Sequence, residues 1–132
     1  MNKIILLLFS VLCLMGRAQG NSVSSDRKLL GESVEIMDSI TNRLLAEHPK
    51  VLLVTGDLTK DGERVSHQYL VDHFLSKLRR SGVRVFVIPG NHDVNNPHAV
   101  VFDGDKTRRT TTVSPSEFAS IYADYGYRQA LA

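Results

Sequence analysis

Two short apolar runs set the strongest limits on how this chain can fold. Residues 51–55 form a β-rich run without polar alternation, which is typical of a strand buried on both faces of a parallel sheet. Residues 83–88 predict a second strand of the same kind. Between them, residues 65–80 carry apolar side chains at helical spacing, and Gly82 follows where a helix end favours positive φ. A strand–helix–strand unit of this kind predicts two parallel strands joined by a right-handed crossover.

Helices are predicted on both sides of this unit. Residues 27–47 have apolar positions at helical spacing, and His48-Pro49 gives a stop signal. Residues 94–113 are expected to form a long polar loop. Ser114-Pro115-Ser116-Glu117 then predicts the start of a third helix through a capping box with proline at the first helical position. The predicted class is α/β, with a parallel strand–helix–strand core and flanking helices. Two strands are few for such a sheet, so we expect an incomplete fold.

The first 20 residues have the layout of a secretory signal peptide. Met1-Asn2-Lys3 is a short positive start, residues 4–15 are almost wholly apolar, and small residues suit cleavage after Ala18 or Gly20. The apolar run is too short for a comfortable membrane span. The alternatives are an uncleaved anchor or a buried strand. We expect an exported protein, periplasmic or secreted, whose mature domain is residues 21–132.

Charge and cysteine content exclude several classes of function. The full chain has a formal net charge of +2, and Lys3 and Arg17 lie within the predicted signal peptide, so the mature chain is near neutral. It offers no broad basic field for nucleic acid and no polybasic patch for anionic lipid. The single cysteine, Cys13, also lies within that segment. A metal ion would therefore depend on carboxylate, imidazole or amide ligands.

Polar residues follow both predicted strands directly. Asp57 comes after the first strand, and Asn91, His92 and Asp93 come after the second. Ligands bind at the carboxyl ends of strands in open α/β sheets, and neighbouring strands lie about 5 Å apart, so these side chains can converge. The set suits phosphoester hydrolysis, in which two cations about 3.5–4 Å apart activate water and neutralise phosphate oxygens. The alternatives are a strand-end residue that satisfies loop amides at Asp57 and an ordinary turn at residues 91–93.

The paired motifs Gly56-Asp57 and Gly90-Asn91-His92-Asp93 resemble the second and third blocks of the calcineurin-like metallophosphoesterases, especially exported bacterial members. The resemblance covers about residues 51–97 and implies part of the metallophosphoesterase sandwich fold. It also implies that Asp57 bridges two metals, that Asn91 ligates one of them, and that His92 acts as acid or charge stabiliser with Asp93 supporting it. Two divalent ions (Mn, Fe or Zn) and a phosphate-ester substrate would follow.

The chain departs from the family pattern at both ends. It has no Asp-x-His block and no Gly-His-x-His block. We therefore expect an incomplete catalytic domain; the alternative is a non-catalytic, truncated remnant with weak or no metal binding. The substrate class and the oligomeric state stay open.

The remaining polar residues are interpreted more simply. Asp61 and Glu63 are expected to be solvated loop charges, although a place near the site is the alternative, and His67 is expected to pack near the first loop. The charged residues between 103 and 109 are expected to be a solvated loop. Contact of Arg108 and Arg109 with a phosphate substrate is the less favoured interpretation.

Overall fold

A parallel three-stranded sheet forms the centre of the molecule. The computed structural model describes residues 4–7, 32–103 and 106–130. The strands are β1 (Ile4–Leu7), β2 (Val51–Thr55) and β3 (Arg84–Ile88), in the order β1-β2-β3. Val51 pairs with Arg84 and Thr55 with Ile88, so β2 and β3 end together. The predicted α/β class and the parallel strand–helix–strand core are confirmed.

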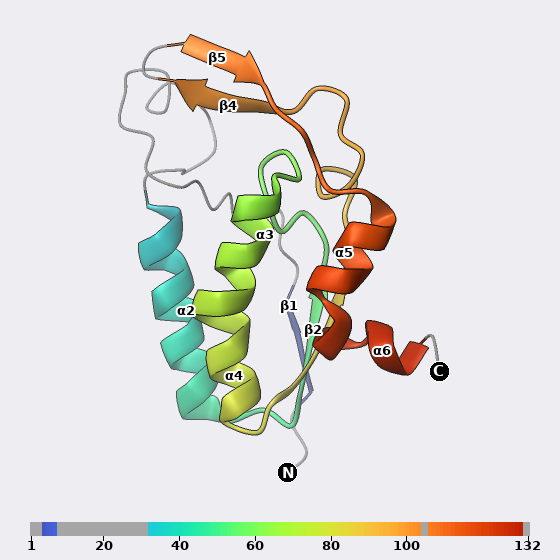
Figure 1. Ribbon diagram of the computed structural model, residues 1–132. Helices are drawn as coiled ribbons and strands as arrows, with labels where there is room; N and C mark the ends of the chain where they lie inside the picture. Colours follow the sequence, from blue (N-terminus) through green and yellow to red (C-terminus); the bar gives the residue numbers. More distant parts are fainter. Residues whose placement is uncertain (1–3, 8–31, 104–105, 131–132) are drawn as a thin grey trace.

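Helices cover one face of this sheet (Figure 1). They are α2 (Ser33–Glu47) and a continuous helical rod made of α3 (Arg64–Leu70), the π-helical turn η1 (Val71–Leu75) and α4 (Ser76–Arg80). The rod ends at Gly82, whose φ of +93° is the left-handed conformation predicted there. The core between helices and sheet is apolar and includes Met37, Leu44, Leu52, Val54, Phe74, Leu78, Val85 and Val87.

The two faces of β3 differ, which corrects one expectation. Val85 and Val87 are buried, whereas Arg84, Phe86 and Ile88 are exposed. The prediction that this strand is buried on both faces is therefore wrong. Phe86 and Ile88 made the run look uniformly apolar, but α2 and the rod pack on the opposite side of the sheet, and on this side Gly126 lies against Phe86.

β1 lies inside the segment predicted to be a signal peptide. Ile4 pairs with Val51 and Leu7 with Val54, in parallel, and Ile5 packs against the core. This arrangement corresponds to the strand alternative that the sequence left open. The cleavage region around Ala18 and Gly20 lies outside the described residues, so cleavage and export remain predictions. No helix within the described ranges is long and apolar enough to cross a membrane.

An antiparallel hairpin stands where the sequence predicts a loop. It consists of β4 (Val100–Asp103) and β5 (Lys106–Arg109), and Val100 pairs with Arg109 at its base. The loop prediction is wrong for these eight residues. Every residue of β5 is exposed, so the strand carries no apolar alternation that sequence patterns could reveal. The hairpin lies at the end of the molecule where β2 and β3 finish (Figure 1).

The chain continues into three short helical segments. They are α5 (Pro115–Ile121), the 3₁₀ turn η2 (Ala123–Tyr125) and α6 (Tyr127–Ala130). The predicted capping box is present: the Ser114 hydroxyl accepts from the Glu117 amide, and the Glu117 carboxylate accepts from the Ser114 amide. These bonds, with the neighbouring Arg64, lower the pKa of Glu117 to about 2. Phe118 and Tyr122 are buried and connect α5 to the core.

Candidate functional site

Two glycines bring the turns after β2 and β3 into direct backbone contact. Gly56 has a φ of +81°, and a Cβ there would lie 2.6 Å from the amide nitrogen of Gly90. A Cβ on Gly90 would lie 2.2 Å from Asp57 Oδ1 and 2.3 Å from the Asp57 nitrogen. No side chain fits either gap, so the glycine in each motif is a packing requirement.

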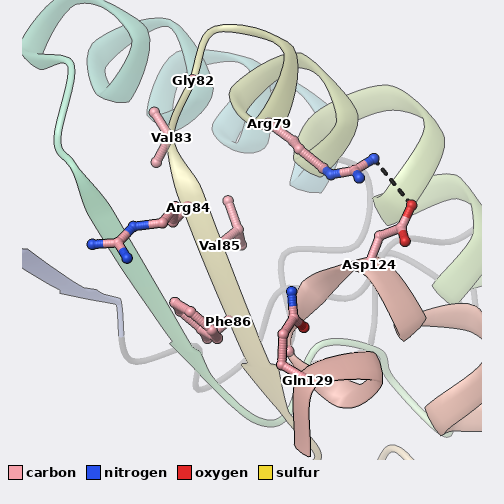
Figure 2. A pocket seen from close by; sticks show the side chains of 9 residues that line it. Arg79, Gly82, Val83, Arg84, Val85, Phe86, Asp124 and Gln129 are labelled. Atoms are coloured by element: carbon pink, nitrogen blue, oxygen red, sulfur yellow. Dashed lines mark ion pairs between the residues drawn. The ribbon is translucent and has the colours of Figure 1, made fainter. Parts of the chain in front are cut away.

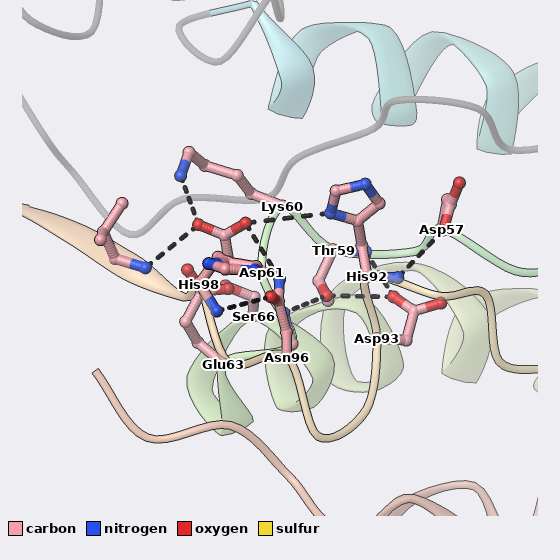
Figure 3. A network of polar contacts seen from close by, with 12 residues as sticks. Asp57, Thr59, Lys60, Asp61, Glu63, Ser66, His92, Asp93, Asn96 and His98 are labelled. Atoms are coloured by element: carbon pink, nitrogen blue, oxygen red, sulfur yellow. Dashed lines mark hydrogen bonds and ion pairs between the residues drawn. The ribbon is translucent and has the colours of Figure 1, made fainter. Parts of the chain in front are cut away.

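Asp57 and His92 meet across this contact. Asp57 has a left-handed φ of +49°, and its Oδ1 accepts a hydrogen bond of 3.4 Å from the His92 amide. Both side chains lie on the same side of the turns (Figure 3). Asn91 is exposed on the turn between them. The strand ends thus bring together Asp57, Asn91 and His92, while the roles implied for these residues stay predictions.

Asp93 faces the other way and ties the two turns together. It is fully buried, and its Oδ1 accepts from the Leu58 amide at 2.8 Å and from the Thr59 amide and hydroxyl at 3.0 Å each. Its Oδ2 accepts from the Gly90 amide at 2.7 Å. These contacts give Asp93 a structural task, since none of them goes to the His92 ring. The resemblance implies support for His92, and Asp93 can give that support through the backbone of the turn.

Asp61 is the carboxylate that lies nearest the His92 ring among the described contacts. His92 Nδ1 is 3.9 Å from Asp61 Oδ1, and within the described residues this buried nitrogen has no hydrogen-bond partner. Asp61 also accepts from Lys60 Nζ at 2.5 Å, from the Asn96 side chain at 3.3 Å and from the Val100 amide at 3.2 Å (Figure 3). Asp61 is only 8% exposed. The expectation of a solvated charge at this position is wrong, because distant partners bury it.

Glu63 is a second buried carboxyl group, and its exposed fraction is 4%. Ser66 Oγ lies 3.4 Å from Oε2, while Oε1 has no hydrogen-bond partner within the described part of the chain. Burial is the main cause that raises the pKa of Glu63, and the nearby charge of Asp61 adds to it. The solvated interpretation is therefore wrong here too.

His67 on α3 contacts the turn that follows β3. It is fully buried, its Nε2 lies 2.9 Å from the carbonyl oxygen of Asp93, and its Nδ1 lies 2.9 Å from the Tyr122 hydroxyl. A carbonyl only accepts, so Nε2 carries the hydrogen and Nδ1 accepts from Tyr122. Burial lowers the pKa of His67, consistent with a neutral ring. This role agrees with the packing expected near the first loop, but its partners could not be read from the sequence.

Comparison with known proteins agrees with this geometry. The family model for calcineurin-like phosphoesterases matches residues 30–128. The chain belongs to the calcineurin-like phosphoesterase family. The match spans both glycine-bearing turns, the hairpin and α5. A comparison with curated proteins gave no match. Family membership indicates metal-dependent hydrolysis of phosphate esters as the chemistry of this fold.

The described side chains alone do not make a two-metal phosphoesterase centre. Asp57 and Asn91 offer oxygen donors of the type expected, and His92 Nδ1 is an orphaned ring nitrogen. Across residues 32–103 and 106–130, however, no three His, Cys, Asp or Glu side chains are grouped so that they could hold a metal ion. His98 is exposed, and His73 lies on the outside of the rod. The donor set falls short of what two divalent ions require.

Cavities elsewhere do not extend this candidate site. One of about 240 Å³ lies beside β3 and is lined by Arg79, Arg84, Phe86, Asp124 and Gln129, among others (Figure 2). An ion pair of 3.0 Å between Arg79 and Asp124 crosses one side of it. None of its lining residues belongs to the two turns. The site is therefore defined by the strand-end turns rather than by this cavity.

Proposed function

We propose that this chain carries the Gly-Asp and Gly-Asn-His-Asp turns of a metal-dependent phosphoesterase. One observation carries the proposal: the Asp57 carboxylate accepts from the His92 amide at 3.4 Å, so an oxygen ligand and an imidazole share one edge of the sheet. The family supplies the expected chemistry, in which divalent ions (Mn, Fe or Zn) activate water and neutralise the phosphate.

Each residue has a distinct part in this proposal. Asp57 and Asn91 supply oxygen ligands, and the His92 ring donates a proton to the leaving oxygen or stabilises its charge. Asp61, 3.9 Å from His92 Nδ1, orients that ring. Asp93 holds the turn through its bonds to Leu58, Thr59 and Gly90. The proposal also includes export, because residues 1–20 have the layout of a signal peptide.

A second candidate is a non-catalytic protein with weak or no metal binding. The observation that favours it is the small donor set: within the described ranges no trio of ligating side chains is assembled. In that case the turns would persist as parts of the fold only. The two candidates predict different metal contents and different activities.

The deciding experiment combines both measurements. The purified chain is incubated with Mn²⁺, its metal content is measured by mass spectrometry, and aryl-phosphate hydrolysis is followed with and without chelator. Metal-dependent turnover that Asp57→Asn abolishes, and that the exposed control Asp38→Asn retains, supports the phosphoesterase. A folded, metal-free and inactive chain supports the second candidate. Detection of the chain in the cytoplasm with residues 1–20 intact would contradict export.

A further inference from the structure

We propose that His67 and Tyr122 are a positioning pair for the proposed phosphoesterase site. Through two hydrogen bonds in series they fix the turn that carries Asn91 and His92. The inference rests on the proposed function, because that function assigns a metal ligand to Asn91 and a proton donor to His92. It adds the segment around Tyr122 to the parts of the chain on which the reaction depends.

The two hydrogen bonds join three parts of the chain that are distant in sequence. His67 Nε2 lies 2.9 Å from the carbonyl oxygen of Asp93, which is 26 residues away. His67 Nδ1 lies 2.9 Å from the hydroxyl of Tyr122, which is 55 residues away and directly follows α5. Asp93 is the next residue after His92 in the turn. The helical rod therefore connects the end of α5 to the turn after β3.

The direction of these two bonds is fixed by the chemistry of the groups. The Asp93 carbonyl can only accept, so His67 Nε2 donates to it, and Nδ1 of the neutral ring accepts from the Tyr122 hydroxyl. The hydroxyl therefore favours the tautomer that can bind the turn. In the other tautomer, an Nε2 without a hydrogen would face the carbonyl oxygen, and two acceptors would repel each other.

The imidazole has little freedom to turn away from the carbonyl. His67 and Tyr122 each have an exposed fraction of 0%. The Phe118 ring packs edge-on against the imidazole, with centroids 5.3 Å apart and an angle of 86° between the planes. The Tyr122 ring packs in the same way, at 5.6 Å and 87°. Close packing of this kind holds a side chain in one rotamer, so Phe118 and Tyr122 determine where His67 meets the turn.

The same turn rests on a second surface, at Gly62. A Cβ on Gly62 would lie 2.8 Å from the carbonyl oxygen of Asp93 and 2.9 Å from that of His92. The bond from the His92 amide to Asp57 is long, at 3.4 Å, and so holds the turn less firmly than the 2.9 Å bond from His67. Loss of the His67 bond should therefore let this peptide move, and His92 would move with it.

A packing role alone would not require polar groups at these two positions. A buried imidazole and a buried hydroxyl lose their hydration, and hydrogen bonds are needed to offset that loss. Apolar rings of similar shape could fill the same space. An apolar ring at position 67 could not, however, donate a hydrogen bond to the Asp93 carbonyl. The polar pair is therefore explained by the turn that it holds.

The test combines heteronuclear NMR of the backbone and imidazole groups with aryl-phosphate hydrolysis in Mn²⁺. His67→Phe keeps a flat ring but removes both bonds. It should shift the amide resonances of residues 91–93 and lower kcat about 10-fold, with less change in KM. Tyr122→Phe removes only the hydroxyl donor, so it should cause a smaller loss together with a mixture of His67 tautomers. His67→Gln keeps a donor for the carbonyl and should restore most of kcat.

Two control variants separate positioning from general stability. Val83→Ala truncates a buried side chain at the other end of β3, and Tyr69→Phe removes a hydroxyl from a half-buried ring on α3. Both should leave kcat and the resonances of residues 91–93 close to those of the unaltered chain. A loss of kcat in Val83→Ala as large as that in His67→Phe would overturn the positioning role, because the loss would then follow stability alone.

The outcomes distinguish this inference from the proposed function. If the unaltered chain has no Mn²⁺-dependent turnover, the phosphoesterase is contradicted, and the pair is judged by NMR. Shifts at residues 91–93 in the His67→Phe and Tyr122→Phe variants but not in the controls then support the pair, and their absence overturns it. If the unaltered chain is active, an unchanged kcat in His67→Phe overturns the pair and leaves the phosphoesterase intact. If His67→Phe does not fold, Tyr122→Phe decides by the same criteria.

Discussion

Asp57 and Gly90 are packed so closely that a Cβ on Gly90 would lie 2.2 Å from the Asp57 carboxylate oxygen. The backbone of the Gly-Asn-His-Asp turn is thus the surface against which the Asp57 carboxylate rests. The geometry of the site depends on this contact before any substrate or ion is present.

Substitution at Gly90 should therefore displace Asp57. We expect Gly90→Ala to reduce the free energy of unfolding by about 2 kcal/mol, because the added methyl group overpacks the contact. Aryl-phosphate hydrolysis should fall with it. Gly82→Ala is the control, since a Cβ there meets nothing within 4 Å and only its φ of +93° is strained. Urea denaturation and an activity assay of both variants check this, and equal behaviour of the two would contradict it.

Loss of the Asp93 charge should destabilise the fold. The carboxylate accepts four hydrogen bonds, and an amide in its place would turn one acceptor into a donor that faces other donors. We expect Asp93→Asn to lower the free energy of unfolding by about 3 kcal/mol. Asp72→Asn, at an exposed carboxylate on the rod, should change it by less than about 0.5 kcal/mol. If urea denaturation gave similar values for both, the structural task assigned to Asp93 would be wrong.

Stability should depend on pH through His67. Burial lowers the pKa of this ring below its ordinary value of 6.5, so the unfolded chain binds the proton first as the pH falls. The neutral ring therefore contributes fully to the free energy of unfolding above pH 6.5. This contribution is lost as the pH falls toward the lowered pKa of the folded state, by at most about 1.4 kcal/mol per pH unit. Urea denaturation at about pH 7.5 and about pH 5.5 measures this loss. His67→Gln should weaken the pH dependence, whereas the exposed His73→Gln should leave it unchanged.

Removal of the Glu63 charge should stabilise the fold, whereas loss of the Asp93 charge should destabilise it. Burial raises the pKa of this carboxyl group, so its destabilising effect grows as the pH rises from the unfolded value of 4.5 through the folded one. We expect Glu63→Gln to raise the free energy of unfolding near neutral pH by about 1 kcal/mol, because it removes a buried charge whose Oε1 has no hydrogen-bond partner within the described residues. The exposed Glu35→Gln provides the comparison. A stability loss at neutral pH in Glu63→Gln would show that the carboxylate has a partner that the buried geometry does not reveal.

The sequence predicted the parts of the fold that are governed by local apolar patterns. Both central strands and the Ser114 capping box are signalled by residues close together in the chain, and the structure has them at the expected places. The hairpin could not be predicted, because β5 is charged and fully exposed. Nor could the one-sided burial of β3 be predicted, since it depends on which side of the sheet α2 and the rod occupy.

The position of the candidate site was predicted more fully than the hydrogen bonds between its residues. Gly56-Asp57 and Gly90-Asn91 follow the strands directly, so topology alone brings them together. Burial of Asp61 depends on Asn96 and Val100, which lie 35 and 39 residues away in sequence. Such long-range partners leave no local pattern, and a charged loop residue then reads as solvated.

The four hydrogen bonds to the Asp93 carboxylate make this residue a requirement of the fold, whatever reaction the chain carries out. A chain that had lost its reaction would still need this aspartate to close its two turns, and it would still need the glycines that let them touch. The Gly-Asp and Gly-Asn-His-Asp motifs therefore indicate this pair of packed turns, with or without hydrolysis of phosphate esters.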